Sequence, residues 1–458
     1  MPLPTTFAGD SSRGAGQWTG SYGTVSSSYW MTSYEDSLFV SPQTEPSDTI
    51  SNIVVDSSKN VYTAGYASGV PKIFVTKQTP TGTFSWAVSI SAGGVNGIQT
   101  NGIAVDSAGN VYVTSYGGNR GYVQKLNSSG ALVYSYQIYN ASGATALASV
   151  AIDSSDNVYL GGFWYSGGPC VIKLNSSGTW QWGVYYNGGS GASGKTVTGL
   201  AIDSAGRINC AVSYGQYGGG VSSNFQLSSS GSFNWSNTLI PTGYSSIQAY
   251  GVTVDSSNNV YFNTQFVNSG NTYYGIAKVA SNGTAVWAQG YLTSASNGVL
   301  WGFPITSDSS GNLYVTGYNS GYAALKFDSS GNFVCSAVAS VGNLTCVALD
   351  NSGNTYWGGS ISTTKNDGAS KPNYAVDALL IKDTNSFAST HAGTFTLNSF
   401  TTTTWGTNSS LSSTAAYTGG SVLTGATANS FSSSSLVSVT TTVANVLGSG
   451  ITTSFVSI

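Results

Sequence analysis

Charged side chains are scarce in this sequence of 458 residues. Asp, Glu, Lys and Arg together make up 7% of it, against about a quarter of an ordinary soluble domain. The 14 cations are scattered and the formal net charge is −3, so the sequence offers no basic surface for nucleic acid. Gly, Ser and Thr replace the charged residues, which predicts a neutral, hydroxyl-rich surface typical of extracellular adhesive proteins and virion appendages.

The usual marks of an active site are also scarce. His391 is the only histidine, and no Cys/His metal spacing, phosphate-binding loop or nucleophile elbow occurs. Seven of the 17 carboxylates anchor turns, and the others show no clustering that suggests an acid/base pair. We therefore expect no enzyme, no cofactor and no metal. The remaining catalytic alternative is a pair of carboxylates that meet from distant parts of the fold.

Long apolar runs are absent. The opening MPLPTTFAGDSSRGAGQW lacks the basic and apolar regions of a secretory signal, and no stretch approaches the roughly 18 apolar residues of a membrane span. The four cysteines, Cys170, Cys210, Cys335 and Cys346, fall on different predicted strands, so we expect reduced core thiols, with one disulfide as the alternative. These features favour folding inside a cell, followed by use outside it.

A repeat fills most of the chain. Residues 101–136 read NGIAVDSAGNVYVTSYGGNRGYVQKLNSSGALVYSY, and the turn signals DSAGN and NSSG divide them into strands expected at Gly102–Asp106, Asn110–Ser115, Tyr122–Leu126 and Ala131–Gln137. The aspartate recurs 42 to 53 residues apart, at Asp56, Asp106, Asp153, Asp203, Asp255, Asp308 and Asp350. One such unit cannot bury both faces of its sheet. The seven copies therefore predict an all-β fold, a closed seven-bladed β-propeller of four-stranded antiparallel blades.

The repeat carries a specific resemblance. Its second strand reads NVYTAGY, NVYVTSY, NVYLGGF and NLYVTGY in different copies, and a K-L-N-x-S-G run follows, often with a Trp. The pattern D-x-x-G-N-[VL]-Y-V-T-G-Y resembles the bacterial and phage seven-bladed β-propeller repeat family, which is similar in logic to the NHL repeats. The resemblance covers residues 51–385. It implies a scaffold and names no single activity.

Two flanks lie outside the repeats. In the N-terminal arm, residues 1–50, Ser28–Val40 carries a Trp as the fourth strand of the first blade does, so we expect it to complete blade seven. The alternatives are Asn385–Thr390 in that place, or a surface arm. Residues 386–458 contain no charged residue and alternate like strands. We expect a Ser/Thr-rich β module that another subunit covers, with a self-contained small β-domain as the alternative.

The repeated polar residues have structural explanations. Each DSSGN-type turn supplies one carboxylate, too few for calcium, so we expect the aspartates to accept backbone N–H groups while the fourth residue takes a positive φ. The third strand carries a lysine in six blades and Gln226 in blade four. We expect these lysines to lie between blades, with their stems on apolar neighbours and their heads on a carboxylate or carbonyl. They are Lys77, Lys125, Lys173, Lys278, Lys326 and Lys382.

The candidate binding residues lie in the longer loops. Alternating strand direction places the first-to-second and third-to-fourth strand turns on one face, and the second-to-third and fourth-to-first connections on the other. The second face is rich in aromatics, which suit sugar rings, and loops on a rigid scaffold commonly carry recognition. Packing on the neighbouring blade is the alternative for each residue. The candidates are Tyr116, Asn119, Arg120, Trp164, Tyr165, Tyr214, Tyr217, Tyr273, Tyr274, Tyr318 and Tyr322.

Two functional classes remain. The favoured one is a non-enzymatic structural or binding protein of a phage particle, in the tail, a fibre or the capsid surface. It would contact other virion subunits through residues 386–458 and the N-terminal arm, and possible host-surface glycans through the loops. We expect a homo-oligomer or a larger assembly, with no nucleic acid and no membrane span. The alternative is a bacterial secreted or cell-surface propeller adhesin or lectin.

Overall fold

The computed structural model describes fourteen segments of the propeller and six short strands beyond it. The propeller segments are residues 29–36, 48–67, 73–92, 99–138, 144–164, 168–185, 195–214, 224–241, 246–268, 271–292, 304–318, 322–339, 343–365 and 373–383. The short strands lie between residues 395 and 456. Within these residues all regular structure is β, and no helix is present that is long and apolar enough to cross a membrane.

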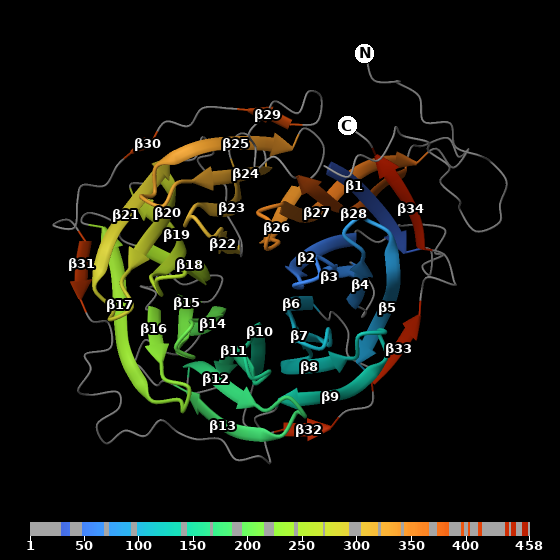
Figure 1. Ribbon diagram of the computed structural model, residues 1–458, viewed down its shortest axis with the longest axis horizontal. Coiled ribbons are helices and arrows are strands. Elements are labelled where there is room, and N and C mark those ends of the chain that lie inside the picture. The colour runs from blue at the N-terminus through green and yellow to red at the C-terminus, as the bar shows by residue number, and fades with distance from the viewer. Residues whose placement is uncertain are drawn as a thin grey trace.

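Seven antiparallel sheets surround a central axis, and the first strand of each lies nearest to it (Figure 1). Blade one consists of β2 (Asp48–Val55), β3 (Val61–Ala67), β4 (Ile73–Gln78) and β5 (Phe84–Ala92). Blade two consists of β6 (Gln99–Val105), β7 (Val111–Gly117), β8 (Arg120–Leu126) and β9 (Leu132–Ile138). Blade three consists of β10 (Thr145–Ile152), β11 (Val158–Trp164), β12 (Gly168–Leu174) and β13 (Trp180–Tyr185).

Blades four to six repeat the pattern. Blade four consists of β14 (Lys195–Ile202), β15 (Ile208–Tyr214), β16 (Asn224–Leu227) and β17 (Phe233–Pro241). Blade five consists of β18 (Ser246–Val254), β19 (Val260–Asn268), β20 (Asn271–Val279) and β21 (Ala285–Leu292). Blade six consists of β22 (Ile305–Ser307), β23 (Leu313–Tyr318), β24 (Tyr322–Phe327) and β25 (Phe333–Ala339). We call the four strands of a blade A, B, C and D from the axis outward.

Blade seven joins the two ends of the propeller. Its A, B and C strands are β26 (Asn343–Leu349), β27 (Thr355–Lys365) and β28 (Asn373–Asp383), and its D strand is β1 (Tyr29–Asp36). β1 pairs antiparallel with β28, from Tyr29 opposite Asp383 to Tyr34 opposite Ala378. The N-terminal segment therefore occupies the place that the sequence analysis expects for Ser28–Val40. The repeat region begins slightly earlier than residue 51, because β2 starts at Asp48.

The innermost strands share one irregularity. In six blades the A–B register skips one residue of the A strand, which is a β-bulge and increases local twist. In three blades the skipped side chain donates to a carbonyl of the next inner strand: Asn101 to Leu147 at 2.8 Å, Thr198 to Ala249 at 2.8 Å, and Thr345 to Ile50. The bulge thus turns a side chain toward the neighbouring blade and links the two.

The hydrophobic core lies in the layers between blades. One cluster combines Tyr62, Val75 and Trp86 of blade one with Val113 and Tyr122 of blade two. Another combines side chains of blades one and seven across the ring closure, including Val61, Tyr356 and Leu380. Each blade therefore buries both faces only in the closed ring.

The described C-terminal strands lie along the outer edges of the blades. The described strands, which we call the rim strands, are β29 (Phe395–Leu397), β30 (Thr402–Thr403), β31 (Leu411–Thr414), β32 (Leu436–Ser438), β33 (Thr441–Asn445) and β34 (Ile451–Val456). They pair with the outer strands of blades six, five, four, two, one and seven in that order (Figure 1). The described part of the tail is thus spread around the circumference and is not gathered into one small domain. A D strand has an unpaired outer edge, and this pairing covers it.

The described cysteines are buried thiols. Cys170, Cys210 and Cys346 are free, and burial raises the pKa of each. A raised pKa keeps a thiol in its unreactive protonated form. The side chain of Cys335 lies outside the described residues.

Candidate functional site

The A–B turns form the most regular polar structure of the ring. In blade one, both oxygens of Asp56 accept hydrogen bonds, from the backbone and side chain of Asn60 at 2.8 Å and from the Tyr62 hydroxyl at 3.0 Å. Six blades repeat this Asp–Asn–Tyr set. The fourth turn residue has a positive φ in all seven blades, including Lys59 and Asp156. The carboxylates thus accept hydrogen bonds from their own turn and from strand B, which is the structural role that the sequence analysis expects for them.

Hydrogen bonds also set the ionisation of these carboxylates. Burial alone would raise the pKa of Asp153, but the donors of Asn157, Tyr159 and Ser155 outweigh it and lower the pKa below its ordinary value. The same balance lowers the pKa of Asp255 and of Asp350. Within the described residues, no three His, Cys, Asp or Glu side chains are grouped closely enough to hold a metal.

The C-strand lysines lie between blades. Their Nζ atoms stand 4.9 to 5.7 Å from the ring centres of the B-strand tyrosines in six blades. Lys125 also donates to the carbonyl of Ser176 in blade three at 2.7 Å and lies 3.6 Å from Asp106. Lys382 donates to Pro80 of blade one at 2.9 Å. The lysines thus form cation–π contacts and interblade hydrogen bonds at separate junctions, not one shared pocket.

Blade four keeps the turn aspartate, Asp203, and replaces its three partners. Arg207 takes the place of the turn Asn and lies 2.6 Å from Asp203 through Nε. Asn209 replaces the tyrosine, and Gln226 replaces the lysine and donates to Asn209 at 2.8 Å. Arg207 supplies the positive charge that the lysine supplies in the other blades. Asp203 is therefore still paired with a cation, although blade four has no C-strand lysine.

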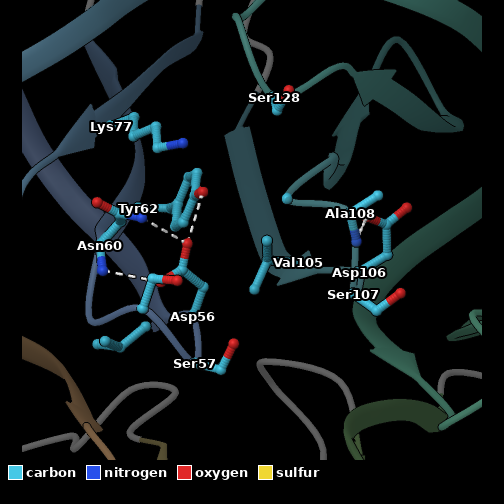
Figure 2. A pocket seen from close by; sticks show the side chains of 13 residues that line it. Asp56, Ser57, Asn60, Tyr62, Lys77, Val105, Asp106, Ser107, Ala108 and Ser128 are labelled. Carbon is cyan, nitrogen blue, oxygen red and sulfur yellow. Dashed lines mark hydrogen bonds between the residues drawn. The ribbon is translucent and has the colours of Figure 1, made fainter.

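A cavity of about 540 Å³ opens on the turn face between blades one and two (Figure 2). Blade one contributes its A–B turn, Tyr62 and Lys77, and blade two contributes its A–B turn and Ser128. The full lining is Val55, Asp56, Ser57, Ser58, Asn60, Tyr62, Lys77, Val105, Asp106, Ser107, Ala108, Gly109 and Ser128. This is the face opposite the one that the sequence analysis favours for binding. Gly109, at the fourth position of the blade-two turn, leaves room for this cavity, but blades four, six and seven carry glycine at the same position, so no sequence signal singles out this junction.

The loop-face candidates whose side chains are described lie in blades two and three. Gly118 and Asn119 have φ values of 57° and 64° and form a two-residue hairpin between β7 and β8. The Tyr116 hydroxyl donates to Asn119 at 3.0 Å, and Arg120 is exposed and donates to Gln137 at 3.1 Å. These three candidates therefore form one small group.

Of the other candidates, Trp164 packs against a neighbouring side chain, and the rest have side chains outside the described residues. Trp164 stacks on Tyr185 with ring centres 6.4 Å apart, as a partly buried member of a core cluster. The backbone places the rest at the B–C ends of their blades, but their side chains lie outside the described residues: Tyr214, Tyr273, Tyr274, Tyr318 and Tyr322. Tyr165 and Tyr217 fall outside the described residues entirely, and so does His391.

Comparison with known proteins supports the propeller fold. A family model described as a beta-propeller repeat matches residues 92–121, and no curated protein matches the chain. Among solved structures, a catalytically inactive virginiamycin B lyase from Staphylococcus aureus with quinupristin is similar over 78% of this chain and 99% of its own, at 10% identity and a TM-score of 0.51. A protein of unknown function from Bacteroides caccae is similar over 57% of this chain and 93% of its own, at 13% identity and a TM-score of 0.35. At these identities the similarity concerns the fold alone.

Proposed function

We propose that this protein is a non-enzymatic structural and binding component of a phage particle. Its rigid ring would present the loop face to another subunit or to a host-surface glycan. The observation that carries the proposal is that the repeated charged side chains make contacts within the ring. The turn aspartates and the C-strand lysines are bound within and between blades. This supports a scaffold whose surface is neutral and whose recognition belongs to its loops.

The hairpin of blade two is the best described part of that loop face. Tyr116 and Arg120 offer an aromatic ring and an exposed guanidinium on a rigid two-residue turn. An aromatic face with polar groups at its edge suits a sugar ring. The backbone of this hairpin is tied to blade three, because the amide of Thr145 donates to the carbonyl of Asn119 at 3.0 Å. A rigid platform lowers the entropy lost on binding.

The proposal is tested on purified particles. Quantitative mass spectrometry of phage particles from the producing strain should detect this chain in fixed stoichiometry with the capsid protein. Its recovery only from the envelope or medium of uninfected cells would instead support the alternative, a bacterial surface adhesin. An array of bacterial glycans tests the loop face: Arg120→Ala with Tyr116→Ala should lose binding, whereas Val133→Ala, a substitution at an exposed residue of β9, should retain it.

A further inference from the structure

Two junctions on the turn face show how the chain bridges its own blades. Between blades two and three, the N–H and hydroxyl of Ser107 donate to the two carboxylate oxygens of Asp156 at 2.9 and 2.6 Å. Between blades four and five, the N–H and hydroxyl of Ser204 donate to the amide oxygen of Asn258 at 3.0 and 2.9 Å. In both cases the second residue of one A–B turn binds an oxygen from the fourth residue of the next.

The junction between blades one and two lacks that bridge, as do the junctions at Gly206, Gly311 and Gly353, and at this junction the structure describes a cavity beside the unbridged serine. The fourth residue of the blade-two turn is Gly109, so no side-chain oxygen reaches Ser57. Within the described segments, no side chain accepts a hydrogen bond from the N–H or hydroxyl of Ser57. Both groups instead lie at the wall of the 540 Å³ cavity. The position that a carboxylate fills at Ser107 is thus open space at Ser57.

Lys77 supplies a second set of donors to the same cavity. Its counterparts Lys125 and Lys382 donate to a carbonyl of the following blade. At this junction the equivalent carbonyl, that of Ser128, accepts from the Trp86 indole at 3.0 Å. The Lys77 ammonium rests 5.2 Å from the Tyr62 ring centre, and the described residues give it no hydrogen-bond acceptor. Figure 2 shows the Lys77 ammonium and the Ser57 hydroxyl directed into the space between the blades.

The two carboxylates of the lining already accept hydrogen bonds on both of their oxygens. Both oxygens of Asp56 accept from Asn60 and Tyr62, and both oxygens of Asp106 accept from its own turn and Tyr112. The lining groups that the structure offers for a ligand include the Lys77 ammonium and the Ser57 hydroxyl, and these donors match an oxygen-rich, anionic ligand. A carboxylate is compatible with the turn aspartates, because Asp156 already holds one beside the turn of Asp106.

We propose that this cavity binds a hexuronate, a sugar ring that carries a carboxylate. The carboxylate would take at Ser57 the place that Asp156 takes at Ser107, and ring hydroxyls would face Lys77 and Ser128. The cavity volume lies within the range of about 300 to 1,000 Å³ that is usual for small-molecule sites, and a lone carboxylate would leave most of it empty. The site lies on the face opposite the loops. Absence of hexuronate binding would therefore leave the proposed function untouched, and refutation of that function would leave this site untouched.

Calorimetric titration of the full chain tests the ligand class. D-glucuronate should bind at least 10-fold more tightly than D-glucose, which lacks the carboxylate, and than acetate, which lacks the ring. Equal binding of glucuronate and glucose would overturn the role of the carboxylate. Equal binding of glucuronate and acetate would overturn the role of the sugar, and absence of glucuronate binding would overturn the site.

A single substitution can fill the site from within. Gly109→Asp should place a carboxylate on Ser57 and reduce glucuronate affinity at least 10-fold. The backbone accepts it, because Gly109 has φ 77° and Asp156 occupies the same turn position with φ 61°. A Cβ at Gly109 would have its nearest neighbours at 3.5 and 3.6 Å, which is ordinary contact.

The matched control is Gly353→Asp in the blade-seven turn. This glycine has φ 79° and open space around a Cβ, and it faces blade six. It should leave glucuronate affinity unchanged while imposing the same backbone change. Unchanged affinity in Gly109→Asp, or an equal loss in both variants, would overturn the assignment. A folded circular dichroism spectrum of each variant shows that the comparison is valid.

Discussion

Replacing Lys125 by methionine should weaken the ring far more than the same change at Lys173. Both lysines hold the same repeat position and lie about 5 Å from a tyrosine ring. Lys125 also donates to Ser176 at 2.7 Å and pairs at 3.6 Å with Asp106, and both side chains are at most 10% exposed. Lys173 has only a longer contact, 3.4 Å to the Ser229 carbonyl.

The magnitude follows from these contacts. A hydrogen bond to a charged group contributes about 1.5 to 3 kcal/mol, and loss of the ammonium leaves the buried Asp106 without its cation. We expect Lys125→Met to destabilise by about 3 kcal/mol, and Lys173→Met by about 1 kcal/mol, chiefly the cation–π contact. For a cooperative unit of some 330 residues, 1 kcal/mol lowers Tm by roughly 1.5 °C, so the expected losses are about 4 and 1.5 °C.

Differential scanning calorimetry of the two variants beside the unsubstituted protein measures this difference. Methionine keeps most of the apolar stem, so the comparison isolates the ammonium group. Equal losses of Tm would refute the reasoning, because they would show that the buried ion pair and the Ser176 hydrogen bond contribute nothing beyond the ring contact.

Three further predictions follow from other contacts. Gly178→Ala should lower the free energy of unfolding in denaturant by about 2 to 4 kcal/mol, because φ is 85° and the new Cβ would lie 2.7 Å from the Tyr134 ring. Gly353→Ala, with no such neighbour, should lower it by about 1 kcal/mol. The pKa values of Asp153, Asp255 and Asp350 are lower in the folded chain than the ordinary 3.8, so their contribution to stability is present above that pH and is lost as pH falls below it. Asp153→Asn should therefore flatten the acid limb of a plot of Tm against pH, and an unchanged limb would contradict this. Deleting residues 386–458 removes the rim strands and uncovers six D-strand edges, so light scattering should show more self-association than in the full chain. Two monomeric chains, full and truncated, would contradict both this edge argument and an assembly role for the tail.

Much of the ring could be predicted because its signals are local. The turn aspartate, the positive φ at the fourth position and the tyrosine of strand B all lie within seven residues of each other. The first two recur in seven blades and the tyrosine in six, since blade four carries Asn209 instead. Strand ends were less predictable. The first strand of blade two was expected at Gly102–Asp106, but β6 extends from Gln99 to Val105, because the bulge at Asn101 interrupts the alternation from which the strand is recognised.

The remaining features depend on distant backbone groups. Lys125 donates to a carbonyl 51 residues away. Every residue has a backbone carbonyl, so the sequence does not show which one accepts this hydrogen bond. The same reason hides the rim strands, since pairing with a D strand uses the main chain of both partners. The cavity could not be predicted because glycine at the position of Gly109 also occurs in blades four, six and seven, and only the packing of blades one and two shows which junction is open.

The place of β1 has a consequence for synthesis. Its partner β28 follows it by about 350 residues, so β1 is synthesised before every other described strand of the ring but pairs with β28 only after the six complete blades have been made. At roughly 5 to 20 residues per second, the interval is on the order of 20 to 70 s. During that time the Trp- and Tyr-bearing segment Tyr29–Asp36 must stay out of wrong pairings while six blades assemble behind it. Closure of the ring therefore depends on β1 remaining available until β28 has been synthesised.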